Sequence, residues 1–145
     1  MGLTRFEDWP ARLVPLISDR LTAPFCWGTH DCALFACDAV LAMTGTDLAA
    51  DFRGRYDSAI GAARRLRELG FRDLQDVATA FAAKHGIAQI ASPRFAQRGD
   101  VGLILDESGA LGALAICSGD GFATARESGG LVKVPARLIS DAWRI

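Results

Sequence analysis

The spacing of apolar residues between Asp8 and Gly86 predicts four helices, because hydrophobic positions recur every three or four residues. We expect these helices at 8–21, 31–43, 56–69 and 73–86, and an aspartate stands at the cap position of the first, second and fourth. The apolar side of the third helix, which is predicted to face inward, consists of Ile60, Ala63, Leu66 and Leu69.

The second of these helices has almost no polar face. Residues 33–43 are apolar except for Asp38, and a helix that is apolar on all sides is usually buried. Asp31 precedes this helix as a cap, and Gly45 ends it. We therefore expect a buried helix at the centre of the domain, with Cys32 in its first turn.

After Ile87 the pattern changes from helical to extended. Short runs rich in branched residues are separated by glycine turns at 98–100, 108–109, 119–121 and 129–130. The runs are IAQI, VGLIL, ALGALAIC, FATA, LVKV and AWRI. Helices followed by strands indicate an α+β fold, in which a C-terminal antiparallel sheet packs against the buried helix. The length of 145 residues is typical of one domain, which we expect to span 1–145.

Composition and charge narrow the choice of partners. Half of the residues are hydrophobic and 23% are charged, as in ordinary globular domains. The formal net charge is −1, and the basic residues are mixed with acidic ones rather than gathered in a stripe. We therefore expect no nucleic-acid partner. No apolar run approaches the length of a membrane helix, so no membrane anchor is expected either.

Four cysteines, at positions 26, 32, 37 and 117, are irregularly spaced. The N-terminal residues MGLTRFEDW lack the apolar segment of a secretory signal. Both features favour reduced thiols over a disulfide framework, and they predict a protein that is made in a bacterial cytoplasm.

Cys32 is the candidate nucleophile. A thiol in the first turn of a helix faces unpaired backbone N–H groups and the positive end of the helix dipole, which lowers its pKa. The alternative is that Cys32 is a small buried hydrophobic residue without chemistry. The first interpretation predicts faster alkylation of Cys32 than of Cys37 or Cys117.

Two segments carry a family resemblance. Pro24-Phe25-Cys26-Trp27-Gly28 followed by Asp31-Cys32-Ala33-Leu34-Phe35 resembles the PYxWG and DCSGLV element of NlpC/P60 cysteine peptidases, which are papain-fold enzymes that cut peptidoglycan stem peptides. The segments 99–104 and 114–121 resemble the family's GDLVFF strand and HVGIYLGDG hairpin. The chain is also similar to small phage and prophage proteins with a WGxHDC motif and a terminal AWR. The resemblance implies a papain-like NlpC/P60 fold.

The departures from the family pattern concern catalysis. The histidine that serves as base in the family falls on Ala113, and the third polar residue falls near Thr124. The tyrosine that assists the oxyanion site is replaced by Phe25. A thiol without a paired base loses a proton shuttle worth about 10²–10⁴ in rate. The sequence therefore leaves open whether the chain is an enzyme.

His30 is the remaining candidate for a base, because it precedes Cys32 by two residues and can share a side with it in an extended lead-in to the helix. Its alternative role is that of a residue tethering the loop. Four residues of types that bind zinc, Cys26, His30, Cys32 and Cys37, lie within twelve positions, but their spacing is not that of common zinc sites. We expect no metal and no cofactor.

The resemblance predicts a component of the tail tip of a phage, prophage or gene-transfer agent, found in the cytoplasm when made and then in the particle. In one form of this hypothesis the domain is structural and has a degenerate active site. In the other it is an active cysteine peptidase or amidase that acts on peptidoglycan. The expected partners are tail-tip or hub proteins. Phe52 and Phe95, which lie in predicted loops, are candidate anchors, and the alternative is that they close over the core.

Overall fold

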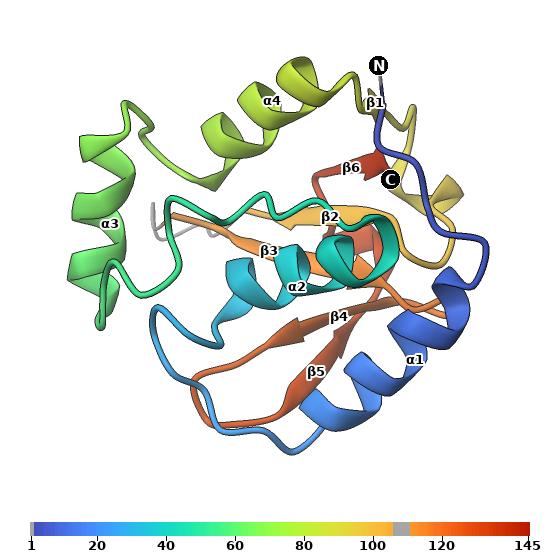
Figure 1. Cartoon of the computed structure of the whole chain (residues 1–145), viewed down its shortest axis with the longest axis horizontal. Coiled ribbons are helices and arrows are strands. Elements are labelled where there is room, and N and C mark those ends of the chain that lie inside the picture. The colour runs from blue at the N-terminus through green and yellow to red at the C-terminus, as the bar shows by residue number, and fades with distance from the viewer. Residues whose placement is uncertain (1, 106–110) are drawn as a thin grey trace.

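Residues 2–105 and 111–145 are described by a computed structural model (Figure 1). Four α-helices lie in the first part of the chain, and a six-stranded sheet follows within these residues. The helices are α1 (Trp9–Arg20), α2 (Cys32–Thr44), α3 (Ala59–Glu68) and α4 (Leu74–His85). The fold is therefore α+β, with helices first and strands afterwards, as the sequence predicts.

The helix boundaries follow from their caps. Asp31, Ser58 and Asp73 are extended, and each accepts a hydrogen bond from the backbone N–H three residues ahead. Gly45 and Gly86 end α2 and α4 in the left-handed conformation, which glycine adopts without steric cost.

All neighbouring strands of the sheet are antiparallel. The strands are β1 (Ala88–Gln89), β2 (Val101–Ile104), β3 (Ala113–Cys117), β4 (Phe122–Ala125), β5 (Leu131–Val134) and β6 (Asp141–Arg144). Their order in the sheet is β1-β6-β2-β3-β4-β5, so the last strand of the chain lies between the first two. The antiparallel C-terminal sheet is thus confirmed.

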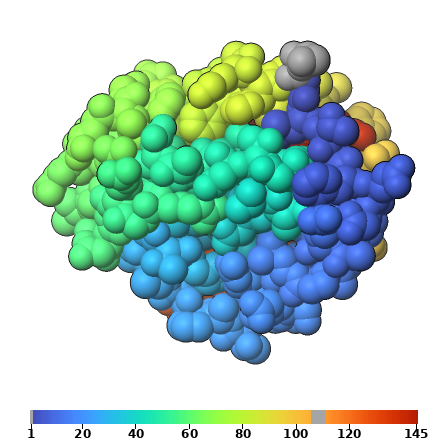
Figure 2. All heavy atoms as spheres, in the orientation of Figure 1, coloured from blue at the N-terminus to red at the C-terminus, as the bar shows by residue number. Residues whose placement is uncertain are grey.

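The core lies between α2 and one face of the sheet. Helix α2 packs on β3 and β4, and α1 packs beside α2 (Figure 1). Phe35 and Met43 of α2 and Leu103 and Ile116 of the sheet are completely buried. Figure 2 shows that the N-terminal segment, the helices and the α2–α3 segment cover most of this face. The prediction of a buried central helix that begins near Cys32 is confirmed.

A smaller apolar cluster lies on the other face of the sheet. It consists of Ala115, Cys117, Phe122 and Ile139. Two 3₁₀ turns, η1 (Pro93–Phe95) and η2 (Ala136–Leu138), lie next to each other over this face. Ala96, directly after η1, and Ala136, the first residue of η2, pack on the cluster.

Asp100, part of the motif that resembles GDLVFF, is completely buried and joins the two ends of the described chain. Its Oδ1 accepts hydrogen bonds from Arg5 Nη2 at 3.0 Å and from the backbone N–H of Ile145 at 3.2 Å. Arg5 Nε also donates to the carbonyl of Ile145 at 2.8 Å. This motif therefore has a structural role.

Two predictions about exposure differ from the structure. Ile60 was expected to face inward but is 74% exposed, because the buried side of α3 is formed by Ala62 and Leu66. Phe52 packs in the main core and is unsuited to anchor a partner, whereas Phe95 is 55% exposed, as an anchor requires.

Within 2–105 and 111–145, no helix is long and apolar enough to cross a membrane.

Candidate functional site

The turn before α2 holds Cys32 in place. Cys26 and His30 close this turn with two backbone hydrogen bonds of 2.8 and 2.9 Å. Gly28 between them has a φ of +83°, and a Cβ at this position would lie 1.9 Å from the carbonyl oxygen of Tyr56. The close approach of the two backbone segments therefore requires glycine at position 28.

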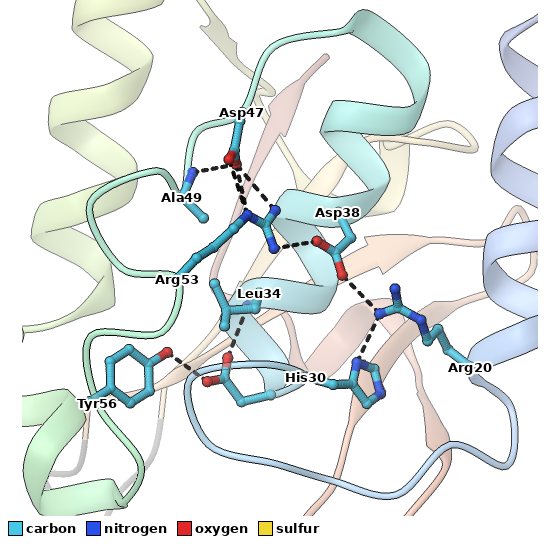
Figure 3. A network of polar contacts seen from close by, with 9 residues as sticks. Arg20, His30, Leu34, Asp38, Asp47, Ala49, Arg53 and Tyr56 are labelled. Carbon is cyan, nitrogen blue, oxygen red and sulfur yellow. Dashed lines mark hydrogen bonds and ion pairs between the residues drawn. The ribbon is translucent and has the colours of Figure 1, made fainter.

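Asp31 connects this turn to α2 and to the segment before α3. Its Oδ1 accepts the N–H of Leu34 at 2.9 Å, and its Oδ2 accepts the N–H of Gly28 at 3.1 Å and the hydroxyl of Tyr56 at 2.6 Å. A carboxylate that is only 1% exposed is tolerated in an apolar interior because these three donors satisfy it. Figure 3 shows the Tyr56 hydroxyl pointing at this carboxylate.

The thiol of Cys32 faces strand β3. The backbone amide of Leu114 acts on the sulfur, as does that of Ala33. Burial, followed by the negative charge of Asp31, raises the pKa of Cys32 to about 11, although the backbone amides oppose both effects. The prediction of a lowered pKa is therefore wrong, because burial and the adjacent carboxylate outweigh the helix N-terminus. At neutral pH the thiolate is a minor species.

No basic side chain stands at the two positions where the resemblance expects one. Ala113 is the first residue of β3, beside the amide that faces Cys32. The hydroxyl of Thr124 on β4 is buried and donates to the carbonyl of Leu114 at 2.8 Å. Thr124 therefore supports the pairing of β3 and β4.

His30 is buried and directed toward α1. Its Nδ1 lies 3.0 Å from Arg20 Nη1, and because arginine only donates, Nδ1 accepts and the proton resides on Nε2. Nε2 is buried and has no hydrogen-bond partner within the described residues. Burial and the charge of Arg20 lower the pKa of His30, which favours the neutral ring.

His30 and Cys32 are not among the groups that act on each other's pKa, although Asp31 acts on both. The groups that act on the Cys32 thiol are Asp31 and backbone amides, whereas those that act on His30 are Arg20, Asp38 and Asp31. The assignment of His30 as a base stays a prediction, and the geometry gives it no direct support. Its observed contact is structural.

Arg20 also belongs to an ion-pair network (Figure 3). Its Nη1 lies 2.8 Å from Asp38, and the other oxygen of Asp38 lies 2.6 Å from Arg53. Arg53 continues to Asp47 at 3.0 Å. The network joins α1, the middle of α2 and the α2–α3 segment, which explains why the one charged residue of α2 occurs where it does.

Protonation of His30 is expected to destabilise the fold as the pH falls below 6.5. Its pKa in the folded chain lies below the ordinary value of 6.5, so the unfolded chain binds a proton first. Stability is then lost between pH 6.5 and the folded pKa, and it changes no further below that value through this group. Urea midpoints measured from pH 7.5 to 5 test this expectation.

In that experiment His30→Gln should reduce the fall of the urea midpoint with decreasing pH. His85→Gln, which changes the other histidine, should leave that fall unchanged. Equal slopes for the wild-type chain and His30→Gln contradict the expectation. The change of the urea midpoint with pH is compared, and not the midpoint at one pH, because His30→Gln also alters the contact with Arg20 and so shifts the midpoint at every pH.

The site also includes features that the sequence did not indicate. Tyr56 was expected as the first residue of the third helix, but it lies before α3 and closes over Asp31. Cys32 also lines a cavity of about 620 Å³ between α2, α3, α4 and the sheet. Within the described residues, no cluster of three or more His, Cys, Asp or Glu side chains is arranged to hold a metal ion.

Comparison with known proteins gives one family. No curated protein and no solved structure matches the chain. A family model described as "Domain of unknown function (DUF6950)" matches residues 4–145, nearly the whole chain. The chain therefore belongs to the DUF6950 family.

Proposed function

We propose that the chain is a component of the tail tip of a phage, prophage or gene-transfer agent, with a papain-like NlpC/P60 domain whose active site is degenerate. Support comes from the order of its elements. A cysteine begins the buried helix α2, and its thiol faces the start of β3 in an antiparallel sheet. This arrangement is the one that the resemblance implies.

The observation that carries the structural role is the state of the Cys32 thiol. Cys32 is partly buried, the pKa of its thiol is raised to about 11, and the groups acting on the thiol are backbone amides and a carboxylate. Nucleophilic catalysis by cysteine requires a thiolate or a base that creates one. Ala113 and the engaged hydroxyl of Thr124 supply neither.

Phe95 and Leu138 support a protein partner. They belong to the adjacent turns η1 and η2 and are 55% and 51% exposed. Exposed Arg94 and Arg137 flank them and form no salt bridge with any residue in 2–105 or 111–145. Aromatic residues, phenylalanine among them, and arginine are enriched at protein interfaces relative to the rest of the surface. We assign this patch to contact with tail-tip or hub proteins.

The proposal is tested by comparing particles from a strain that lacks the gene with particles from a strain carrying Cys32→Ala. Deletion is expected to leave tails unfinished, and Cys32→Ala is expected to leave tail number and infectivity or gene transfer unchanged. Purified wild-type particles should contain the chain at a fixed ratio to other tail proteins. Absence of the chain from particles contradicts the proposal.

The same strains also distinguish the structural role from the alternative, in which the protein is an active cysteine peptidase. If Cys32→Ala yields complete tails that adsorb but do not cross the cell wall, the thiol is catalytic. The purified wild-type chain would then release peptides from muropeptides, and Cys32→Ala would not. We expect intact muropeptides with both proteins.

A further inference from the structure

The cavity beside Cys32 is bounded by three helices and the sheet. Its walls include Ala33 of α2, Leu66 of α3, Phe81 of α4, Val101 of β2 and Trp143 of β6. Its volume of about 620 Å³ lies within the range of about 300–1,000 Å³ that is typical of small-molecule sites. The cavity therefore has the size of a ligand site, and most of its walls belong to regular elements.

The space arises from alanines that face one another across helices. Ala33 and Ala36 lie on α2, Ala62 and Ala63 on α3, and Ala78 and Ala82 on α4, and all six line the cavity. The larger side chains of the lining, such as Leu66 and Phe81, do not fill the space opposite these alanines. The gap is a direct product of the sequence.

Among the described residues the lining is mostly apolar, and its polar groups include the Trp27 indole N–H and the Cys32 thiol. Asp31 and Tyr56 line the cavity, but the Tyr56 hydroxyl is bonded to Asp31 at 2.6 Å, and Asp31 also accepts two backbone N–H groups. The other charged residues of the lining, Arg67 of α3 and Glu127 after β4, are exposed. The cavity thus opens to the surface near Arg67 and Glu127 and is apolar within.

We propose that this cavity binds a long alkyl chain, either as a free fatty acid or as the acyl chain of a lipid. An inserted peptide would bring a series of backbone N–H and C=O groups into a space whose described lining is mostly apolar, and each group left without a partner would weaken binding. An alkyl chain carries no such groups. Each methylene transferred from water into the cavity is expected to tighten binding about fourfold. This proposal does not depend on the proposed tail-tip function.

Binding is tested on the purified full chain with 11-(dansylamino)undecanoic acid, whose fluorescence rises in an apolar site. We expect a saturable signal that palmitate displaces. Palmitate at about 100 times its Kd should also raise the Tm by about 5–10 °C, because a ligand that binds only the folded chain stabilises it by mass action.

Ala78→Phe is the variant that fills the cavity, and Thr79→Phe, the same side chain on the exposed side of α4, is the matched control. Ala78→Phe should weaken probe binding at least tenfold, since it displaces about two or more methylenes of ligand. Thr79→Phe should change it less than twofold. Ala63→Phe places the same side chain in the cavity from α3. It is a second filling variant, which keeps the test valid if Ala78→Phe does not fold.

Vesicles of phosphatidylglycerol show whether the bound alkyl group belongs to a membrane lipid or to a free fatty acid. Sedimentation of the wild-type chain with vesicles, lost in Ala78→Phe, assigns the acyl chain of a membrane lipid, while binding of palmitate alone assigns a free fatty acid. The proposal is overturned by the absence of saturable binding, or by binding that both filling variants retain. Binding of an apolar peptide in place of palmitate also overturns it.

Discussion

Replacing Gly28 with alanine is expected to reduce the free energy of unfolding by about 3–5 kcal/mol, which combines strain at a positive φ with displacement of backbone. Gly28 has a φ of +83°, and the new Cβ would lie 1.9 Å from the Tyr56 carbonyl oxygen. Relief requires the two backbone segments to separate, which also weakens the bonds of Asp31 to both. Urea denaturation followed by circular dichroism measures the loss.

Gly54→Ala is the control for this experiment. Gly54 also has a positive φ, +68°, but a Cβ there meets nothing within 4 Å. Gly54→Ala should therefore reduce the free energy of unfolding only by the strain of an alanine in the left-handed conformation, about 1–2 kcal/mol. Similar losses for both variants would show that the approach of Tyr56 to Gly28 contributes little.

Asp31→Ala is expected to destabilise the chain by about 4 kcal/mol, because buried donors left without an acceptor cost about 1–3 kcal/mol each. The variant leaves the N–H groups of Gly28 and Leu34 and the hydroxyl of Tyr56 without this acceptor. Thermal unfolding and urea denaturation give the change in stability.

Asp73→Ala supplies the matched comparison. Asp73 is also the N-cap of a helix, α4, but its side chain caps through one bond to the N–H of Asp76. A single cap contributes about 1 kcal/mol. Tyr56→Phe should lie between the two, since it removes one of the donors to Asp31. Equal effects of Asp31→Ala and Asp73→Ala would mean that Asp31 is no more than a helix cap.

The secondary structure was predictable because its signals are local. Caps at Asp31 and Asp73, stops at Gly45 and Gly86, and branched runs between glycine turns each depend on neighbouring residues. The buried position of α2 followed from its apolar composition alone. These features needed no knowledge of distant contacts.

The chemistry of the site was less predictable because it depends on residues far apart in the sequence. The position of Cys32 at the helix start was correct, but its pKa is raised by burial beneath segments that the local pattern does not locate. Tyr56 reaches Asp31 from 25 positions away. The cavity likewise requires the alanines of three helices to face one another.

The joining of Gly28 and Asp31 to the segment before α3 has a consequence for folding kinetics. The contacts are the N–H of Gly54 to the carbonyl of Gly28 at 2.9 Å and the Tyr56 hydroxyl to Asp31. Closing this loop has an entropic cost that must be met before the contacts stabilise anything. This loop spans 25 positions, far fewer than separate α2 from β3, so its closure costs less entropy and the surroundings of Cys32 are expected to form before α2 docks on β3 and β4. Tyr56→Phe should then slow refolding more than it accelerates unfolding.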